Sequence, residues 1–261
     1  MTDILVLCYH AISERWPAEL AVTPTQFEQQ LRYLVGRGYR GATFTAALTQ
    51  RAPGRTLVVT FDDALRSVRE LAVPVLDRLG LAATVFAPTA YVGSDRPMSW
   101  PGIDHWLGTP HGPELLPLSW GELRELVAAG WEVGSHSRTH PRLTQLDDSE
   151  LARELSRSKE ECEQRLGRPC TSIAYPFGDV DGRVAAAAAR AGYRAGAALS
   201  ARPHRPRRLE WPRYGVSRED SAARFRRQVS PFVRRLRASP AGPAADRAGA
   251  LLLGVLRRRR G

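Results

Sequence analysis

The segment Leu57-Val58-Val59-Thr60-Phe61-Asp62-Asp63 is the strongest indication of how this chain folds. It is an apolar run typical of a buried strand, and it ends on two adjacent carboxylates. Carboxylates beside an apolar core are costly unless a cation or hydrogen-bond donors meet them, so this pair requires a partner. We expect that partner to be a metal ion, with its other ligands further along the chain.

Two histidines follow a second apolar stretch, Trp131 to Gly134. His136 and His140 are separated by three residues in the sequence SHSRTH. One carboxylate and two imidazoles form the ligand set of an open catalytic zinc site, and the remaining carboxylate is then available as a base. Paired aspartates also occur in Mg²⁺-binding pockets of response regulators and in phosphatases, but neither alternative explains the histidines. Spacing alone does not tell the two aspartates apart.

Three motifs resemble those of the polysaccharide deacetylase family, the NodB-homology carbohydrate esterases. Residues 60–64, TFDDA, are similar to the family's TFDDG motif, and residues 136–140 match its HSxTH motif. Residues 174–178, AYPFG, are similar to its third motif as found in the exopolysaccharide deacetylase branch. The order of the motifs also agrees, and the resemblance covers roughly residues 4–216.

The resemblance implies a role for each of these residues. Asp63, His136 and His140 would hold one divalent ion, with Zn²⁺ expected and Co²⁺ or Ni²⁺ as alternatives. Asp62 would be the general base that takes a proton from water. The backbone N–H of Tyr175 would meet the tetrahedral oxyanion, although a simple turn after a strand also explains the third motif.

The acid that protonates the leaving group is assigned differently. The family's late Leu-His motif is absent, because residues 251–256 hold no histidine and His204 lies in a loop rich in arginine and proline. In the exopolysaccharide branch a Tyr-His pair after the first strand supplies the acid, and Tyr9-His10 is similar to that pair. We therefore assign the acid to His10; the alternative is a core histidine bonded to the backbone.

Two positions depart from the family pattern. Ala64 stands where the first motif usually has glycine, and apolar residues stand where an arginine often precedes the third motif and orients the base. Arg213, in the last expected strand, is the candidate to orient Asp62 instead.

Strand-like and helix-like segments alternate along the chain. Apolar runs predict strands at 4–8, 57–61, 82–87, 131–134, 172–174, 193–199 and 211–216. Helical spacing and capping residues predict helices over 24–35, 66–79, 119–129, 146–166, 180–192 and 221–236. This pattern favours an α/β fold with a parallel sheet closed or nearly closed into a barrel. The resemblance implies the distorted (β/α) barrel of the NodB type, with its site at the carboxyl ends of the strands.

Residues 88–118 are too long and irregular for an ordinary connection. They are rich in proline and glycine and contain Tyr91, Trp100, Trp106 and His111. Two interpretations stay open: an ordered cap over the site that stacks on sugar rings, or a surface excursion with its own small cluster.

Composition bounds the organisation of the chain. Its 261 residues suit one catalytic domain, expected over 1–216, and a basic C-terminal extension over 217–261. The three cysteines form no CxxC pair, which favours thiols in a reducing compartment. The start has no basic segment before its short apolar run, and no stretch approaches a membrane span, so we expect a cytoplasmic protein.

The net charge of +11 is unevenly distributed. Residues 202–261 hold seventeen arginines and four acidic residues, which gives +13 there and −2 over the first 201 residues. With the apolar strip 251–256 beside Arg257 to Arg260, this segment predicts contact with an anionic membrane surface. The alternative is a solvated tail whose arginines reflect a GC-rich genome.

The function expected from these residues is metal-dependent removal of an N-linked acetyl group from an amino sugar, releasing acetate. The carbohydrate substrate would be a polysaccharide, an oligosaccharide or a lipid-linked sugar, and no nucleic acid is expected. Two alternatives remain: hydrolysis of a non-sugar amide or formamide on the same fold, and a catalytically silent protein that binds membrane or nucleic acid through its basic tail. The oligomeric state is not predicted.

Overall fold

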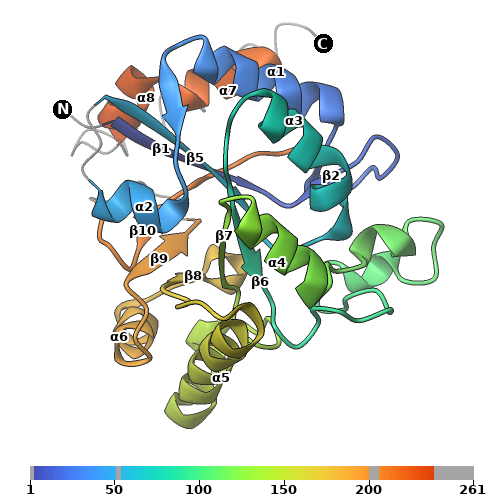
Figure 1. The fold of residues 1–261 in the computed structure, drawn as a ribbon, viewed down its shortest axis with the longest axis vertical. Coiled ribbons are helices and arrows are strands. Elements are labelled where there is room, and N and C mark those ends of the chain that lie inside the picture. Colours follow the sequence, from blue (N-terminus) through green and yellow to red (C-terminus); the bar gives the residue numbers. More distant parts are fainter. Residues whose placement is uncertain (1–2, 51–53, 200–205, 238–261) are drawn as a thin grey trace, which may run out of the picture.

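The main sheet is parallel and curls until its two edges nearly meet (Figure 1). The computed structural model of the protein describes residues 3–50, 54–199 and 206–237. The strand order is β10-β9-β8-β7-β6-β5-β1-β11, with β4 paired to β5. Their bounds are β1 Asp3–Tyr9, β4 Tyr39–Gly41, β5 Arg55–Phe61, β6 Thr84–Ala87, β7 Glu132–Ser135, β8 Ser172–Ala174, β9 Ala195–Ala198, β10 Trp211–Pro212 and β11 Tyr214–Gly215.

Arg213 joins the two edges of this sheet. It stands between β10, which pairs with β9, and β11, which pairs with β1. One residue therefore lies at the seam of the nearly closed barrel, and the expected (β/α)-barrel architecture is confirmed. The single strand expected over 211–216 is split at this seam.

Helices surround the sheet (Figure 1). They are α1 Pro24–Val35, α2 Phe44–Thr49, α3 Val73–Arg78, α4 Trp120–Ala128, α5 Asp148–Leu166, α6 Gly182–Arg190, α7 Ala222–Val229 and α8 Pro231–Arg237. Capping boxes at Thr23, Ser119 and Asp147 begin α1, α4 and α5, as their sequence signatures predict. A two-stranded sheet of β2 (Ala11–Ile12) and β3 (Ala21–Val22) and five short single turns complete the described elements.

Side chains alternate across β1 and β5, as a strand requires. Leu5, Leu7, Leu57 and Val59 belong to the large core cluster shared with the outer helices, whereas Val6 and Val58 belong to the smaller cluster with Phe44 and Phe86. Along β5 the same alternation places Thr60 and Asp62 on the side of Val58. Asp62 therefore leaves the strand on the side away from the outer helices.

The structure departs from the expected helices at two prolines. The helix expected over 66–79 is a π-turn at Val68–Ala72 followed by α3, with Pro74 in the first turn of α3. Proline has no N–H and clashes with the carbonyl four residues before it, so the hydrogen-bonding pattern changes there. The basic helix expected over 221–236 is likewise broken into α7 and α8, with Pro231 opening α8.

Part of the expected C-terminal extension packs on the barrel. Phe225 and Val229 of α7 are buried in the large core cluster, and Arg226 lies over the ring of Tyr33 on α1. The proposed boundary at residue 216 stays a prediction, but α7 shares the core of the catalytic domain. His204 and the apolar strip 251–256 lie outside the described residues.

Candidate active site

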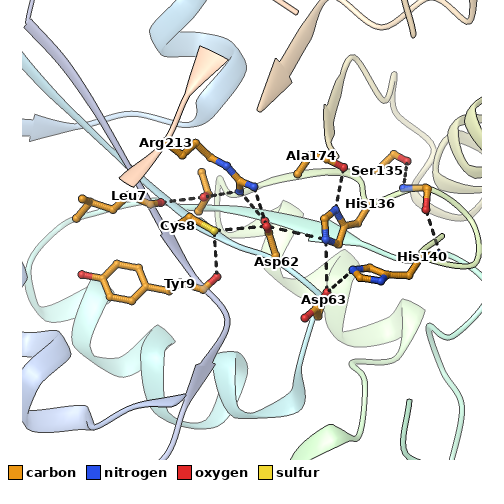
Figure 2. Close-up of polar contacts among 12 residues, drawn as sticks. Leu7, Cys8, Tyr9, Asp62, Asp63, Ser135, His136, His140, Ala174 and Arg213 are labelled. Atoms are coloured by element: carbon orange, nitrogen blue, oxygen red, sulfur yellow. Dashed lines mark hydrogen bonds and ion pairs between the residues drawn. The ribbon is translucent and has the colours of Figure 1, made fainter. Parts of the chain in front are cut away.

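The carboxyl ends of the strands bring every predicted site residue to one end of the barrel. His10 follows β1, Asp62 and Asp63 follow β5, and Tyr175 follows β8. His136 and His140 follow β7, and Arg213 lies at the seam. Figure 2 shows Asp62 between Arg213 and His136, with Asp63 below the two imidazoles.

The side chains of Asp63, His136 and His140 converge on one point. The Nε2 atoms of His136 and His140 each lie 3.5 Å from Oδ1 of Asp63 (Figure 2). Two donor atoms held tetrahedrally by zinc at about 2.1 Å are roughly 3.4 Å apart. All three residues are buried, and Oδ1 of Asp63 has no hydrogen-bond partner among the described residues. A buried acceptor without a donor, facing two imidazole nitrogens, fits a divalent cation.

Both imidazoles are in the neutral form that a metal ligand requires. Burial lowers the pKa of His136 to about 4 and that of His140 to about 2, so each is uncharged at neutral pH. The Nδ1 atom of His136 lies 2.8 Å from the carbonyl oxygen of Ala174, and donation to that oxygen leaves Nε2 with its lone pair. Burial and the neighbouring Asp62 raise the pKa of Asp63, as expected for a carboxylate that faces no protein cation.

Asp62 has the opposite environment. Arg213 donates to both of its carboxylate oxygens, at 2.6 and 2.7 Å, and also to the hydroxyl of Thr60 at 3.1 Å. Burial alone would raise the pKa of Asp62, but the charge of Arg213 and the nearby His136 hold it below its usual value. The candidate base is therefore ionised and fixed in position. Arg213 occupies the place predicted for a base-orienting residue; its functional role stays a prediction.

His10 also lies close to Asp62. One ring nitrogen of His10, the sulfur of Cys8 and a carboxylate oxygen of Asp62 all lie within 4.8 Å of one another. Burial lowers the pKa of His10, while the charge of Asp62 acts against that shift. This position is compatible with the predicted role of His10 as the acid, which stays a prediction. Cys8 donates to Oδ2 of Asp62 at 3.4 Å, and this contact was not predicted.

Tyr175 does not offer a free backbone donor. Its N–H donates to the carbonyl of Ala197 at 3.2 Å as part of the pairing of β8 with β9, and its hydroxyl donates to the carbonyl of Leu209. The predicted oxyanion role would require the Ala197 bond to break. The N–H of Phe177, two residues further on, has no acceptor among the described residues, and the Phe177 ring lies 4.8 Å from that of His140.

Backbone strain is concentrated at this end of the barrel. Among the described residues other than glycine, positive φ angles occur at Asp63, Ala64, Ser137, His140 and Phe177. The left-handed region costs a side-chain-bearing residue of order 1 kcal/mol or more, and such residues cluster at functional sites. At Ala64 the angle is 52°, which explains why glycine suits that position of the motif.

A family model described as "Polysaccharide deacetylase" matches residues 49–196 of the chain. The chain belongs to the polysaccharide deacetylase family.

 All three motifs, at residues 60–64, 136–140 and 174–178, therefore fall within the matched segment.

Similar proteins agree with this membership. The YxkH protein of Bacillus subtilis is 27% identical over 196 residues, which are 73% of this chain and 62% of that protein. A poly-beta-1,6-N-acetyl-D-glucosamine N-deacetylase of Staphylococcus aureus is 23% identical over 171 residues, 60% of this chain and 54% of that protein. The crystal structure of BC0361, a polysaccharide deacetylase from Bacillus cereus, is 26% identical with a TM-score of 0.70, covering 87% of this chain and 69% of that one. The chain spans between half and two thirds of the length of these curated relatives.

The family's histidine motif is held in place by α5. The carboxylate of Glu154 accepts hydrogen bonds from the N–H of Arg138 at 2.8 Å, the N–H of Thr139 at 2.9 Å and the hydroxyl of Thr139 at 2.7 Å. Inside the same loop, the hydroxyl of Ser137 accepts from the N–H of His140 at 3.1 Å. These bonds fix the backbone on which both histidines stand.

The long connection over 88–118 forms an ordered cap in this family member. Trp100 stacks on the ring of His140, with ring centres 4.0 Å apart and an interplanar angle of 20°. The cap also has its own cluster, in which Trp100, Met98 and Leu115 pack with Trp16 and Leu65. Features of both interpretations are therefore present; stacking on sugar rings stays a prediction.

Sequence reasoning missed Glu154, Cys8 and the stacking of Trp100. Glu154 is one of several acidic residues on α5, so only the path of the loop reveals its role. Cys8 could have been found, because it precedes His10 by two residues and so shares its side of the strand. Trp100 was placed in the cap, but its partner depends on how an irregular segment folds.

Proposed function

We propose that this chain hydrolyses the N-acetyl group of an amino sugar with the help of one divalent metal ion. The observation that carries the proposal is the convergence of Asp63, His136 and His140 beside the arginine-held carboxylate of Asp62. Membership of the polysaccharide deacetylase family supports the same reaction class. Zn²⁺ is the expected ion, because a carboxylate and two imidazoles suit it and leave positions open.

Asp63, His136 and His140 would hold the ion, which when bound polarises the amide carbonyl and makes water more acidic. Asp62 takes the proton of the attacking water, because Arg213 keeps its carboxylate ionised. His10, with a ring nitrogen within 4.8 Å of an Asp62 oxygen, gives a proton to the departing nitrogen as the carbon–nitrogen bond breaks. The products are acetate and a free amine.

An amide donor for the oxyanion is also proposed. Tyr175 was predicted for this role, but its N–H is bonded within the sheet. The Phe177 N–H, without an acceptor among the described residues and beside His140, is the better candidate.

The proposed substrates are amino sugars in a polysaccharide, an oligosaccharide or a lipid-linked form. The Staphylococcus aureus relative, by its name, acts on poly-beta-1,6-N-acetyl-D-glucosamine. N-acetylglucosamine oligomers with β-1,6 linkages are therefore the first substrates to test.

Metal content and acetate release test the proposal together. Purified protein should contain one divalent ion per chain, and it should release acetate from N-acetylated oligomers. The double variant His136→Ala, His140→Ala should lose both the ion and the activity. A stoichiometric ion in that variant would show that the site is elsewhere, and acetate or formate release from non-sugar amides alone would favour the alternative substrate class.

Single variants test the proton transfers. Asp62→Asn should keep the ion and lose roughly a hundredfold or more in kcat, since a general base typically contributes about 10² to 10⁴. His10→Ala should cause a similar loss, and His10→Gln should not restore it, because glutamine cannot supply a proton. Full activity in both His10 variants, with the ion present, would assign the acid to another residue.

A further inference from the structure

A groove of about 560 Å³ opens beside the candidate acid. Its walls come from three separate parts of the chain: the β2–β3 connection, the cap, and the segment after β11. The residues that matter for its chemistry are His10, Glu19, His105, Trp106, Asp220 and Arg224. None of Asp63, His136 and His140 is among the described residues that line it.

His10 connects the groove to Asp62. One ring nitrogen of His10 lies within 4.8 Å of a carboxylate oxygen of Asp62, and Nε2 of His136 lies 3.9 Å from Oδ2 of the same carboxylate. An amide that reacts between them has its acetyl end at the candidate ion and its nitrogen toward His10. Because the sugar is attached to that nitrogen, it must continue into the space on the His10 side.

The lining of the groove suits a neutral ligand rich in hydroxyl groups. Trp106 offers a half-buried aromatic surface whose orientation is fixed by edge contacts with Trp16 at 5.9 Å and His111 at 5.4 Å. The exposed side chain of Glu19 has no partner among the described residues and is free to accept from a hydroxyl. Asp220 and Arg224 pair at 2.9 Å, so they add polar atoms with little net charge.

We propose that this groove binds the sugar from which the acetyl group is removed, together with the next sugar of the chain. Its volume lies within the range of about 300 to 1,000 Å³ typical of ligand sites, far more than an acetyl group needs. The proposal rests on the proposed function, since it takes the position of the sugar from the role of His10. It also gives the segment after β11 a part in substrate binding.

Binding of a β-1,6-linked N-acetylglucosamine tetramer to the zinc-loaded Asp62→Asn protein tests this groove without turnover. Trp106→Ala and Glu19→Ala, each added to that background, should weaken tetramer binding roughly three- to tenfold, the effect of losing one contact. Because Glu19 is exposed, Glu19→Ala should not disturb folding, and it tests the groove even where the Trp106 variant fails to fold. Arg157→Ala is the matched control, because it lines a different groove beside Thr139.

The proposal is overturned if both groove variants bind the tetramer as tightly as the parent, or if the parent does not bind it. An equal loss in the Arg157 control would also overturn it, since the effect would then not be local. Acetate release by the wild-type protein is measured separately. Tetramer binding that depends on the groove but comes with no acetate release would count against the proposed function alone.

Discussion

Asp62 and Asp63 are neighbours with the same side chain and opposite environments. Both oxygens of Asp62 accept from Arg213, whereas Oδ1 of Asp63 faces two neutral imidazoles. The pKa of the first carboxyl is lowered and that of the second is raised. Environments that separate two carboxyl groups in this way assign them different tasks. Here they separate the candidate base, which stays ionised, from the candidate metal ligand.

Replacement of Arg213 should move the acidic limb of the pH–rate profile. In the wild type the lowered pKa of Asp62 keeps the base ionised well below neutral pH. Arg213→Met removes the charge that lowers this pKa and leaves burial, which raises it. The fall in kcat/KM on acidification should therefore begin at a higher pH, and Arg213→Lys should shift it less. An unchanged profile in the methionine variant would exclude Arg213 as the residue that sets the acidity of the base.

The same substitution should lower stability at neutral pH. Breaking a buried ion pair by removing one partner typically costs about 3 to 5 kcal/mol. Because the folded-state pKa of Asp62 is depressed, its contribution is present above the unfolded-state pKa of about 3.9 and is lost as the pH falls through the folded value. Urea unfolding measures the free energy of unfolding of both proteins. The difference between the wild type and Arg213→Met should be larger at pH 7 than at pH 3.

The helix α5 supports the loop over residues 136–140 without contributing a candidate ligand. Three hydrogen bonds to Glu154 hold the loop at Arg138 and Thr139, between the two histidines. Ser137 and His140 in that loop have positive φ angles, so the loop needs external support to keep its shape. The helix therefore stabilises the ligand geometry through the backbone.

Glu154→Ala should weaken binding of Zn²⁺ by roughly ten- to a hundredfold, as is typical when outer-shell support is lost. Competition with a zinc chelator measures this affinity directly. Glu154→Gln retains one acceptor oxygen, so its affinity for Zn²⁺ should lie between those of the alanine variant and the wild type. Glu160→Ala, which changes an exposed residue of the same helix, should bind Zn²⁺ as the wild type does. Equal affinity in the alanine and wild-type proteins would show that the loop keeps its shape unaided.

The long elements and the strand at 172–174 could be predicted from the sequence, and several other short elements could not. Apolar runs such as 57–61 and capping residues such as Asp147 determine β5 and α5 locally. In contrast, β2, β3 and α2 are too short to show a period, and the π-turn at Val68 depends on packing around Pro74. The convergence of the candidate ligands was predictable because these residues follow strand ends in motifs. The hydrogen bond from the Tyr175 N–H to the Ala197 carbonyl was not predictable, because the sequence of one strand does not show which strand pairs with it.

Positive charge is concentrated in the C-terminal part of the chain, after residue 201. No helix among the described residues is both long and apolar enough to cross a bilayer. The +13 of residues 202–261 lies partly on α7 and α8 and partly in residues 238–261, which the structure does not describe. Cytoplasmic location and peripheral membrane contact through this segment stay proposals.

Flotation with liposomes tests the membrane proposal. Full-length protein should float with anionic vesicles and not with neutral ones, since basic residues near such a surface contribute about 1 kcal/mol each. A version truncated after Ala238 should float less. Equal flotation of both proteins, or of neither, would count against a membrane role for the tail and favour a solvated one.

The position of Arg213 at the seam has a consequence for the order in which the site is assembled. Every candidate metal ligand has been synthesised once the chain reaches His140, but the cation that holds Asp62 follows more than seventy residues later. A chain that ends before Arg213 contains the complete set of candidate ligands but lacks the cation that pairs with Asp62. The restraint on Asp62 therefore depends on the pairing of β11, the last strand, with β1, the first.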